Sequence, residues 1–398
     1  MVFNSLGSNY NFKFAMKALF GFGNASDGPG LKALLENQFQ GQATLLYKGR
    51  EAIALALRLL NLPKASAVAI NGYTCYAVYQ PIVEAGLTVE YLDVENGALN
   101  FSAQTLLESV QKNPQIKVVI IQNTLGYPCD VKAIAQVCKE KNLILIEDLA
   151  HSVGAKYSSG QPAGSVGDFV VLSFGQDKII DAVSGGALIV KNKKYQSLAL
   201  PTLTSVTSKK KLADRFYPNF TWKIRTNYSM GVGRIDHLIL KKLGWLSQPM
   251  GADEKIILHS LPNWYAKMAK YCFENLLANI SHRKTISQIY ANGLNKKVLI
   301  PSVVSQINNS TNLRFPILVN NRELLISKLK TSGIHVSDIW YDAPIAPKKY
   351  LAKTNYNHEC LNAEKISAGM LNLPTHINVT KAIAENIIRG INLWIQSQ

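Results

Sequence analysis

The sequence predicts an α/β protein built on a central, mainly parallel sheet flanked by helices, followed by a smaller C-terminal α+β domain. Three observations lead to this prediction. Short β-branched runs alternate with helical patterns over residues 49–190, a basic and aromatic stretch over 191–261 interrupts them, and an alternation of strands and helices resumes after residue 296. The 398 residues exceed the usual size of one domain, and 47% hydrophobic with 17% charged residues suits a large core.

The first part of the chain carries the elements of the predicted sheet. Strand patterns cover residues 67–70, 88–92, 117–121, 143–146, 168–174 and 187–190. Helical patterns lie between them at residues 52–60, 75–85, 103–111 and 131–141. Strands that alternate with helices form parallel sheets, and such sheets bind ligands beyond the carboxyl ends of their strands.

The later elements divide the chain into three parts. We expect a large domain over residues 1–261, which includes the stretch 191–261 as an insert, and a long connecting helix over 262–295. The small domain covers residues 296–398. Its predicted elements are a strand (313–319), a helix (322–332), a strand (333–337), an irregular linker and a helix (380–395).

The net charge indicates which kind of partner the protein binds, and the cysteine content indicates its cellular compartment. The formal net charge of +17 favours anionic partners such as phosphates. The five cysteines are scattered without metal-ligand spacing, which predicts reduced thiols in a cytoplasmic protein and no metal site. The first 30 residues lack the pattern of a signal peptide, and no run of about 18 apolar residues would span a membrane.

Residues 209–245 combine nine basic and two acidic side chains with six interleaved aromatic residues. One interpretation is a solvated extension whose aromatic side chains pack against a partner subunit. The other is an amphipathic surface that touches anionic lipid headgroups, which would make the protein peripherally membrane-associated. The stretch contains no recognisable nucleic-acid-binding motif, so we expect no nucleic-acid partner.

Asp148 and Lys178 are the strongest candidates for catalytic chemistry. Alone, Asp148 could cap a turn and Lys178 could be a solvated loop lysine. Each follows a predicted strand, however, so both should lie at the ligand-binding edge of the sheet. A lysine that condenses with an aldehyde, and a carboxylate that keeps a pyridine nitrogen protonated, are what pyridoxal 5'-phosphate (PLP) chemistry requires. Ser173 and the backbone amides near Gly49 could hold the phosphate.

The motifs around these residues resemble the DegT/DnrJ/EryC1/StrS family of PLP-dependent sugar aminotransferases, which has the fold-type I PLP-transferase architecture. The resemblance covers nearly the whole chain. Its most specific part consists of Glu147-Asp148-Leu149-Ala150-His151 with Gly154-Ala155, Gly164-Ser165-Val166-Gly167-Asp168, and Ser173-Phe174 with Lys178 and Gly185-Gly186.

The resemblance implies a role for each matched residue. Lys178 would form the Schiff base with PLP and, once freed, shuttle the proton as general base and acid. Asp148 would contact the pyridine nitrogen, and His151 would lie beside the ring near its phenolic oxygen. Ser173 and the helix start at Gly49-Arg50-Glu51 would hold the phosphate.

Two further matches concern the ring and the quaternary structure. Cys75 stands where many family members stack an aromatic residue on the ring, so Tyr73, Tyr76 or Cys75 itself could pack there. Asn263 matches the asparagine that reaches the phosphate in the neighbouring subunit, which implies a homodimer with shared active sites. Arg50 departs from the family, which has a small residue at this position of the phosphate site.

The expected reaction is transfer of an amino group, from glutamate by resemblance, to a keto sugar linked to a nucleotide or a lipid, in amino-sugar or cell-surface glycan biosynthesis. Two alternatives remain open from the sequence. One is PLP chemistry on a non-sugar ketone, and the other is a non-catalytic protein that keeps the scaffold for binding or membrane association.

Overall fold

A seven-stranded sheet forms the centre of the protein in the computed structural model, which describes residues 1–247 and 254–398. Its strand order is β2-β9-β8-β7-β6-β3-β5, and β9 alone runs antiparallel to its neighbours. The strands are β2 (Gln42–Leu46), β3 (Ala67–Asn71), β5 (Thr88–Leu92), β6 (Ile116–Ile121), β7 (Ile144–Asp148), β8 (Phe169–Ser173) and β9 (Gly186–Val190). The predicted α/β class with a mainly parallel sheet is therefore confirmed.

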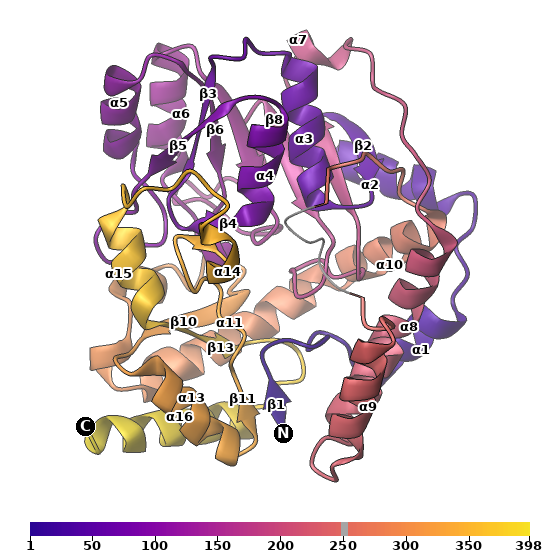
Figure 1. The fold of residues 1–398 in the computed structure, drawn as a ribbon, viewed down its shortest axis with the longest axis vertical. Coiled ribbons are helices and arrows are strands. Elements are labelled where there is room, and N and C mark those ends of the chain that lie inside the picture. The colour runs from indigo at the N-terminus through magenta and orange to yellow at the C-terminus, as the bar shows by residue number, and fades with distance from the viewer. Residues whose placement is uncertain (248–253) are drawn as a thin grey trace.

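Both faces of this sheet are buried at its inner strands, so those strands are mostly apolar along their length instead of alternating. In β6, Val118 and Ile120 pack with α3 (Gly49–Leu60) and α4 (Tyr76–Glu84) on one face. Val119 and Ile121 face the opposite core, which is covered by the helices α2 (Asp27–Phe39), α5 (Ala103–Lys112), α6 (Val131–Glu140) and α10 (Asn263–Glu274). Figure 1 shows these helices around the sheet.

The C-terminal part forms a second core around two antiparallel strands, β10 (Arg314–Leu318) and β13 (Met370–Pro374). Its helices are α11 (Leu276–Gly293), α12 (Pro301–Ser305), α13 (Arg322–Thr331), α14 (Lys348–Leu351), α15 (Leu361–Gly369) and α16 (Lys381–Gln396), with the 3-10 helix η2 (Lys296–Val298). The strand β11 (Ile334–His335) pairs with β1 (Val2–Phe3) at the start of the chain. The domain boundaries at residues 261 and 295 stay predictions. The first strand of the chain, β1, belongs to the predicted large domain but pairs with β11 of the C-terminal part.

The single connecting helix predicted over 262–295 is wrong in one respect, because the structure has two helices, α10 and α11, that meet at Asn275. The Asn275 amide group donates to the Tyr271 carbonyl at 2.7 Å, and its φ of −101° departs from helical geometry. An asparagine side chain that competes for a helical carbonyl interrupts a helix in this way.

The insert contributes α7 (Lys193–Gln196), α8 (Ser208–Thr226) and α9 (Val232–Lys242), while its residues 248–253 lie outside the described part of the chain. The helix α8 packs along α1 (Phe12–Phe20). Several aromatic residues of the insert pack against other aromatic residues of the same chain. Trp222 contacts Phe12, and Phe216 stacks on Phe220 beside Trp245. Across residues 1–247 and 254–398, none of the helices combines the length and apolarity needed to cross a bilayer.

Candidate active site

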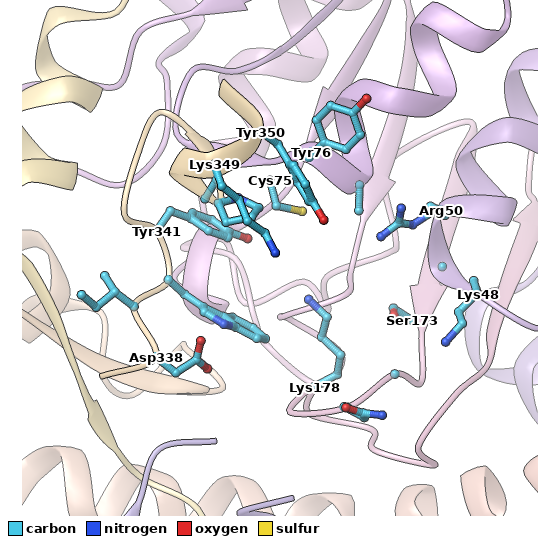
Figure 2. A pocket seen from close by; sticks show the side chains of 18 of the residues that line it. Lys48, Arg50, Cys75, Tyr76, Ser173, Lys178, Asp338, Tyr341, Lys349 and Tyr350 are labelled. Carbon is cyan, nitrogen blue, oxygen red and sulfur yellow. The ribbon is translucent and has the colours of Figure 1, made fainter. Parts of the chain in front are cut away.

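A cavity of about 410 Å³ lies beyond the carboxyl ends of β7 and β8, between the sheet and a segment of the C-terminal part. The short strand β4 (Thr74–Cys75) pairs with β12 (Ile345–Ala346) and so brings that segment to the cavity. In Figure 2, the side chains of Lys178, Arg50 and Lys349 point into the same space from three different elements. The lining comprises Lys48–Arg50, Cys75–Ala77, Ser173, Gly175, Gln176, Lys178, Val183, Asp338–Tyr341, Ala346, Pro347, Lys349 and Tyr350.

Lys178 lies in a loop that hydrogen bonds from the N-terminal residues Asn9 and Tyr10 hold in place. The Asp181 carboxylate accepts from the Asp177 amide at 2.8 Å and from the Tyr10 hydroxyl at 2.5 Å. The Asn9 side chain bridges the same Asp181 carboxylate and the Lys178 carbonyl. These bonds fix the direction in which the lysine side chain leaves the loop.

The Lys178 amine lies 2.9 Å from His151 Nε2 and 4.5 Å from the centre of the Trp340 ring. Burial lowers the pKa of this amine, and the positive charge of Arg314 lowers it further, against the opposing effects of Cys75 and Asp148. A lowered pKa increases the fraction of neutral amine, which is the nucleophilic form.

The hydrogen bonds of His151 favour the same neutral amine. His151 is fully buried, and burial holds the pKa of its ring well below the usual value, so the ring is neutral. Its Nδ1 lies 3.1 Å from the Leu125 amide and accepts that proton, which assigns the ring proton to Nε2. An Nε2–H group can donate to Lys178 Nζ only if the amine carries a free lone pair.

Asp148 is the last residue of β7 and is 4% exposed. Burial raises the pKa of its carboxyl to about 6, although the hydrogen bond from the Ala150 amide at 2.9 Å and the Lys178 charge oppose that shift. A buried carboxylate of this kind gains from a cationic partner such as a protonated pyridine nitrogen.

The neighbouring Glu147 serves the structure and lies away from the cavity lining. Its carboxylate accepts hydrogen bonds from the amides of Gly164, Val166 and Gly167 at 2.6 to 2.7 Å and from the Tyr157 hydroxyl at 2.5 Å. The acidic pair therefore divides its roles, since Glu147 fixes the glycine loop before β8 while Asp148 approaches Lys178.

Cationic groups surround the start of α3 at the other end of the cavity. Lys48 Nζ donates to Ser184 Oγ at 2.9 Å, and burial lowers the pKa of this amine to about 8. The Arg50 guanidinium donates to Gln80 Oε1 at 2.9 Å, and burial lowers its pKa as well. A Cβ atom on Gly49 would lie 2.7 Å from Ser173 Cβ, so glycine is required for this close approach.

Of the remaining site residues expected from the sequence, Cys75 lines the cavity while Glu51 and Asn263 do not. The Glu51 carboxylate binds His259, accepting from its backbone amide at 2.9 Å and lying 3.1 Å from its Nδ1. Asn263 is exposed at the start of α10, beside Gly28. Its expected role concerns a neighbouring subunit and stays a prediction.

Sequence reasoning missed the contribution of residues 338–341 and of Lys349. Arg314 binds Asp338 at 2.8 Å and lies 4.3 Å from the Trp340 ring centre, which holds the Trp340 indole over Lys178. Tyr341 lies next to His151, with its hydroxyl 3.4 Å from Nε2. Residues 338–341 and Lys349 are at least 160 positions from Lys178 and carry no local motif, so no sequence signal pointed to them.

Comparison with known proteins agrees with this geometry. The family model described as the DegT/DnrJ/EryC1/StrS aminotransferase family matches residues 39–392. The chain belongs to this family. It is accordingly a PLP-dependent aminotransferase, as its motifs around Lys178 predicted.

Relatives within the family are named as sugar aminotransferases. The dTDP-4-amino-4,6-dideoxy-D-glucose transaminase of Shigella dysenteriae is 26% identical over 89% of this chain and 86% of that protein. The GDP-perosamine synthase of Caulobacter vibrioides is 23% identical over 86% of this chain and 83% of that protein. The match to the GDP-perosamine synthase of Escherichia coli O157:H7 is 29% identical but spans 40% of this chain and 44% of that protein.

Solved structures share the fold over nearly the whole chain. PseC of Helicobacter pylori, an aminotransferase involved in the biosynthesis of pseudoaminic acid, aligns with a TM-score of 0.73 and 16% identity over 97% of this chain and 96% of that one. The PLP form of the sugar aminotransferase Spr1654 of Streptococcus pneumoniae aligns with a TM-score of 0.72 and 18% identity over 97% and 95%. The predicted fold-type I architecture is confirmed by these neighbours.

The cavity of this aminotransferase fits PLP in both charge and chemistry. Lys178 would offer the aldehyde an amine whose pKa is lowered by burial, and Asp148 would offer a buried carboxylate to the pyridine nitrogen. Lys48, Arg50 and the start of α3 would supply positive charge for the phosphate. When bound, PLP acts as an electron sink that stabilises negative charge on the substrate carbon.

Proposed function

We propose that this aminotransferase moves an amino group from glutamate to a nucleotide-linked keto sugar in amino-sugar biosynthesis. The observation that carries this proposal is the charge of the cavity around the Lys178 amine. Lys48, Arg50 and Lys349 face one carboxylate among the lining residues that the structure describes, Asp338, which is already paired with Arg314. The excess positive charge suits a ligand that carries phosphate groups beyond the one on PLP.

The residues that line the cavity or lie behind its lining have separate tasks in this reaction. The neutral Nζ of Lys178 accepts a proton from the substrate carbon and returns it, because the pKa of the amine is lowered toward the working pH. His151 orients this amine through Nε2. Asp148 would hold the ring nitrogen of bound PLP, and Trp340 covers the amine and limits the access of water.

A spectroscopic experiment tests the proposal on the purified full chain with PLP. Borohydride reduction followed by peptide mapping should leave the cofactor covalently attached at Lys178. Lys349→Ala is a matched control because it removes another lysine of the same cavity and should retain that adduct. An adduct that persists in Lys178→Ala contradicts the assignment.

Substrate class requires a second measurement. Adding glutamate should convert the visible absorption band to that of the aminated cofactor, with 2-oxoglutarate as the co-product. Keto sugars linked to GDP, dTDP or UDP should then restore the original band, since relatives act on sugars carrying each of these nucleotides by name. If only non-sugar ketones restore the band, the sugar assignment fails.

We also propose a cytoplasmic homodimer with shared active sites and a peripheral contact with anionic membrane through residues 209–245. The exposed position of Asn263 at the start of α10 supports the dimer, because the side chain is free to reach a second chain. Light scattering of the purified protein tests the dimer, and a monomeric mass at micromolar concentration contradicts it. Within residues 209–245, the helix α9 is the segment that we expect to make the membrane contact.

A further inference from the structure

The helix α9 presents an apolar stripe to solvent. Val232, Ile235, Leu238, Ile239 and Leu243 follow helical spacing, and each is between 50% and 68% exposed. Such spacing places them on one face of the helix. Met230 before the helix and Trp245 after it extend this face, with exposures of 69% and 37%. In Figure 1, α9 lies beside α8 at the lower edge of the molecule, away from the seven-stranded sheet.

The packing of α9 on α8 determines which face points outward. Gly233 is buried against α8, and a Cβ atom there would lie 2.2 Å from the Ile224 carbonyl oxygen. Asp236 forms an ion pair with Lys223 at 3.4 Å, and Leu240 packs on the main core. These three inward contacts leave the stripe on the opposite side of α9.

Basic side chains accompany the stripe, and the two acids of this stretch are already engaged. Arg234, Lys241 and Lys242 are exposed on α9. Asp236 pairs with Lys223, and Asp214 is fully buried, where it accepts from the hydroxyls of Tyr47 and Tyr265. The surface around the stripe is therefore apolar and positively charged.

We propose that the α9 stripe docks on an anionic phospholipid bilayer, with its apolar side chains entering the interface and its Lys and Arg side chains reaching the headgroups. Charge complementarity favours this occupant over a second copy of the chain. A second copy brings a net charge of +17 to an already cationic face, whereas anionic headgroups neutralise Arg234, Lys241 and Lys242. The helix then lies in the plane of the interface and does not span the membrane.

Sedimentation of the full chain with vesicles tests this proposal. The protein should bind vesicles in which half of the lipid is phosphatidylglycerol and should bind pure phosphatidylcholine far less. Neutralising one basic side chain at the headgroups should weaken binding about fivefold, so Lys241→Gln with Lys242→Gln should weaken it more than tenfold. Raising salt from about 0.1 M to about 1 M, which shortens the Debye length from about 10 Å to about 3 Å, should act in the same direction.

A matched pair of apolar variants separates α9 from the rest of the surface. Leu238→Asn with Ile239→Asn should abolish most binding, while Leu277→Asn with Leu361→Asn should not, although Leu277 and Leu361 are 80% and 68% exposed. All four positions are exposed, so folding should survive, which circular dichroism and thermal melting check. Brominated acyl chains should quench Trp245, and that quenching should disappear in Trp245→Phe.

Three outcomes would overturn the proposal. They are absence of binding to anionic vesicles at low salt, binding that the α9 variants leave unchanged, and a shift in oligomeric mass caused by Leu238→Asn with Ile239→Asn. The last result would mean that a second copy covers the stripe. None of these readouts depends on transaminase activity, so they are independent of the proposed reaction.

Discussion

Replacing Asp148 with asparagine should stabilise the cofactor-free protein while it weakens PLP binding. The Asp148 carboxyl is 4% exposed, and burial raises its pKa from the ordinary value of 3.8 to about 6. A raised pKa means that the folded state binds the proton more tightly than the unfolded state. The ionised carboxylate therefore costs stability, and this cost accumulates as pH rises from 3.8 to 6 and is complete above pH 6.

The magnitude follows from the same two pKa values. For a carboxyl whose pKa is 3.8 in the unfolded state and about 6 in the folded state, ionisation lowers the free energy of unfolding by about 3 kcal/mol at pH 8. At pH 5 the same effect is about 1.5 kcal/mol. Asparagine has no charge to bury, and its amide oxygen can still accept from the Ala150 amide. The stabilisation of Asp148→Asn over the native chain should thus grow by about 1.5 kcal/mol from pH 5 to pH 8.

Urea unfolding of the cofactor-free proteins at pH 5 and pH 8 measures this difference. Asp236→Asn is a control for the loss of one negative charge, because Asp236 is only partly buried and is paired with Lys223. A stability difference that stays constant with pH, or an Asp148→Asn protein that is less stable at pH 8, refutes the reasoning. PLP affinity measured on the same variant should fall, since the ring nitrogen loses its carboxylate.

Three other substitutions test separate parts of the site. Glu147→Gln should lower the free energy of unfolding in chemical denaturation by roughly 3 to 5 kcal/mol, because the amide cannot accept all four hydrogen bonds of the buried carboxylate. Tyr157→Phe removes only one of these four hydrogen bonds and should lower it less. Arg50→Thr should weaken binding of PLP at least tenfold by fluorescence titration but leave binding of pyridoxal, which lacks the phosphate, unchanged; equal losses for both ligands contradict a phosphate contact. Trp340→Ala should admit water to Lys178, so the pKa of the amine rises toward its ordinary value and the pH midpoint for PLP capture in stopped-flow moves upward; an unchanged midpoint contradicts the shielding role.

Most strands and helices of the large domain, and the residues expected to bind its cofactor, could be predicted from hydrophobic periodicity and short motifs. The strand expected over residues 88–92 is present with those limits, and the strands that end near Asp148 and Ser173 are adjacent in the sheet. Because parallel strands end at one edge, the placement of Asp148 and Lys178 after two strands was sufficient to predict that they meet. The roles of all the expected site residues, Lys178 and Asp148 included, remain predictions.

Other features had no local signal. The edge strand β2 and the strand β13 were missed, since Gln42–Leu46 and Met370–Pro374 are short and lack clear alternation. The pairing of β1 with β11 joins residues more than 330 positions apart. The break at Asn275 depends on one side-chain hydrogen bond that periodicity does not report.

The sequence by itself determined the α/β class and the family, and it singled out Lys178 and Asp148 as the expected cofactor residues, because periodicity and short motifs are local properties of the chain. Only the tertiary structure decided what surrounds them. Trp340 lies over Lys178 and Lys349 enters the same cavity because β12 pairs with β4. The apolar side of α9 faces outward because Gly233 allows α9 to lie against α8. Such contacts depend on which surfaces pack together, and side-chain spacing along the chain does not carry that information.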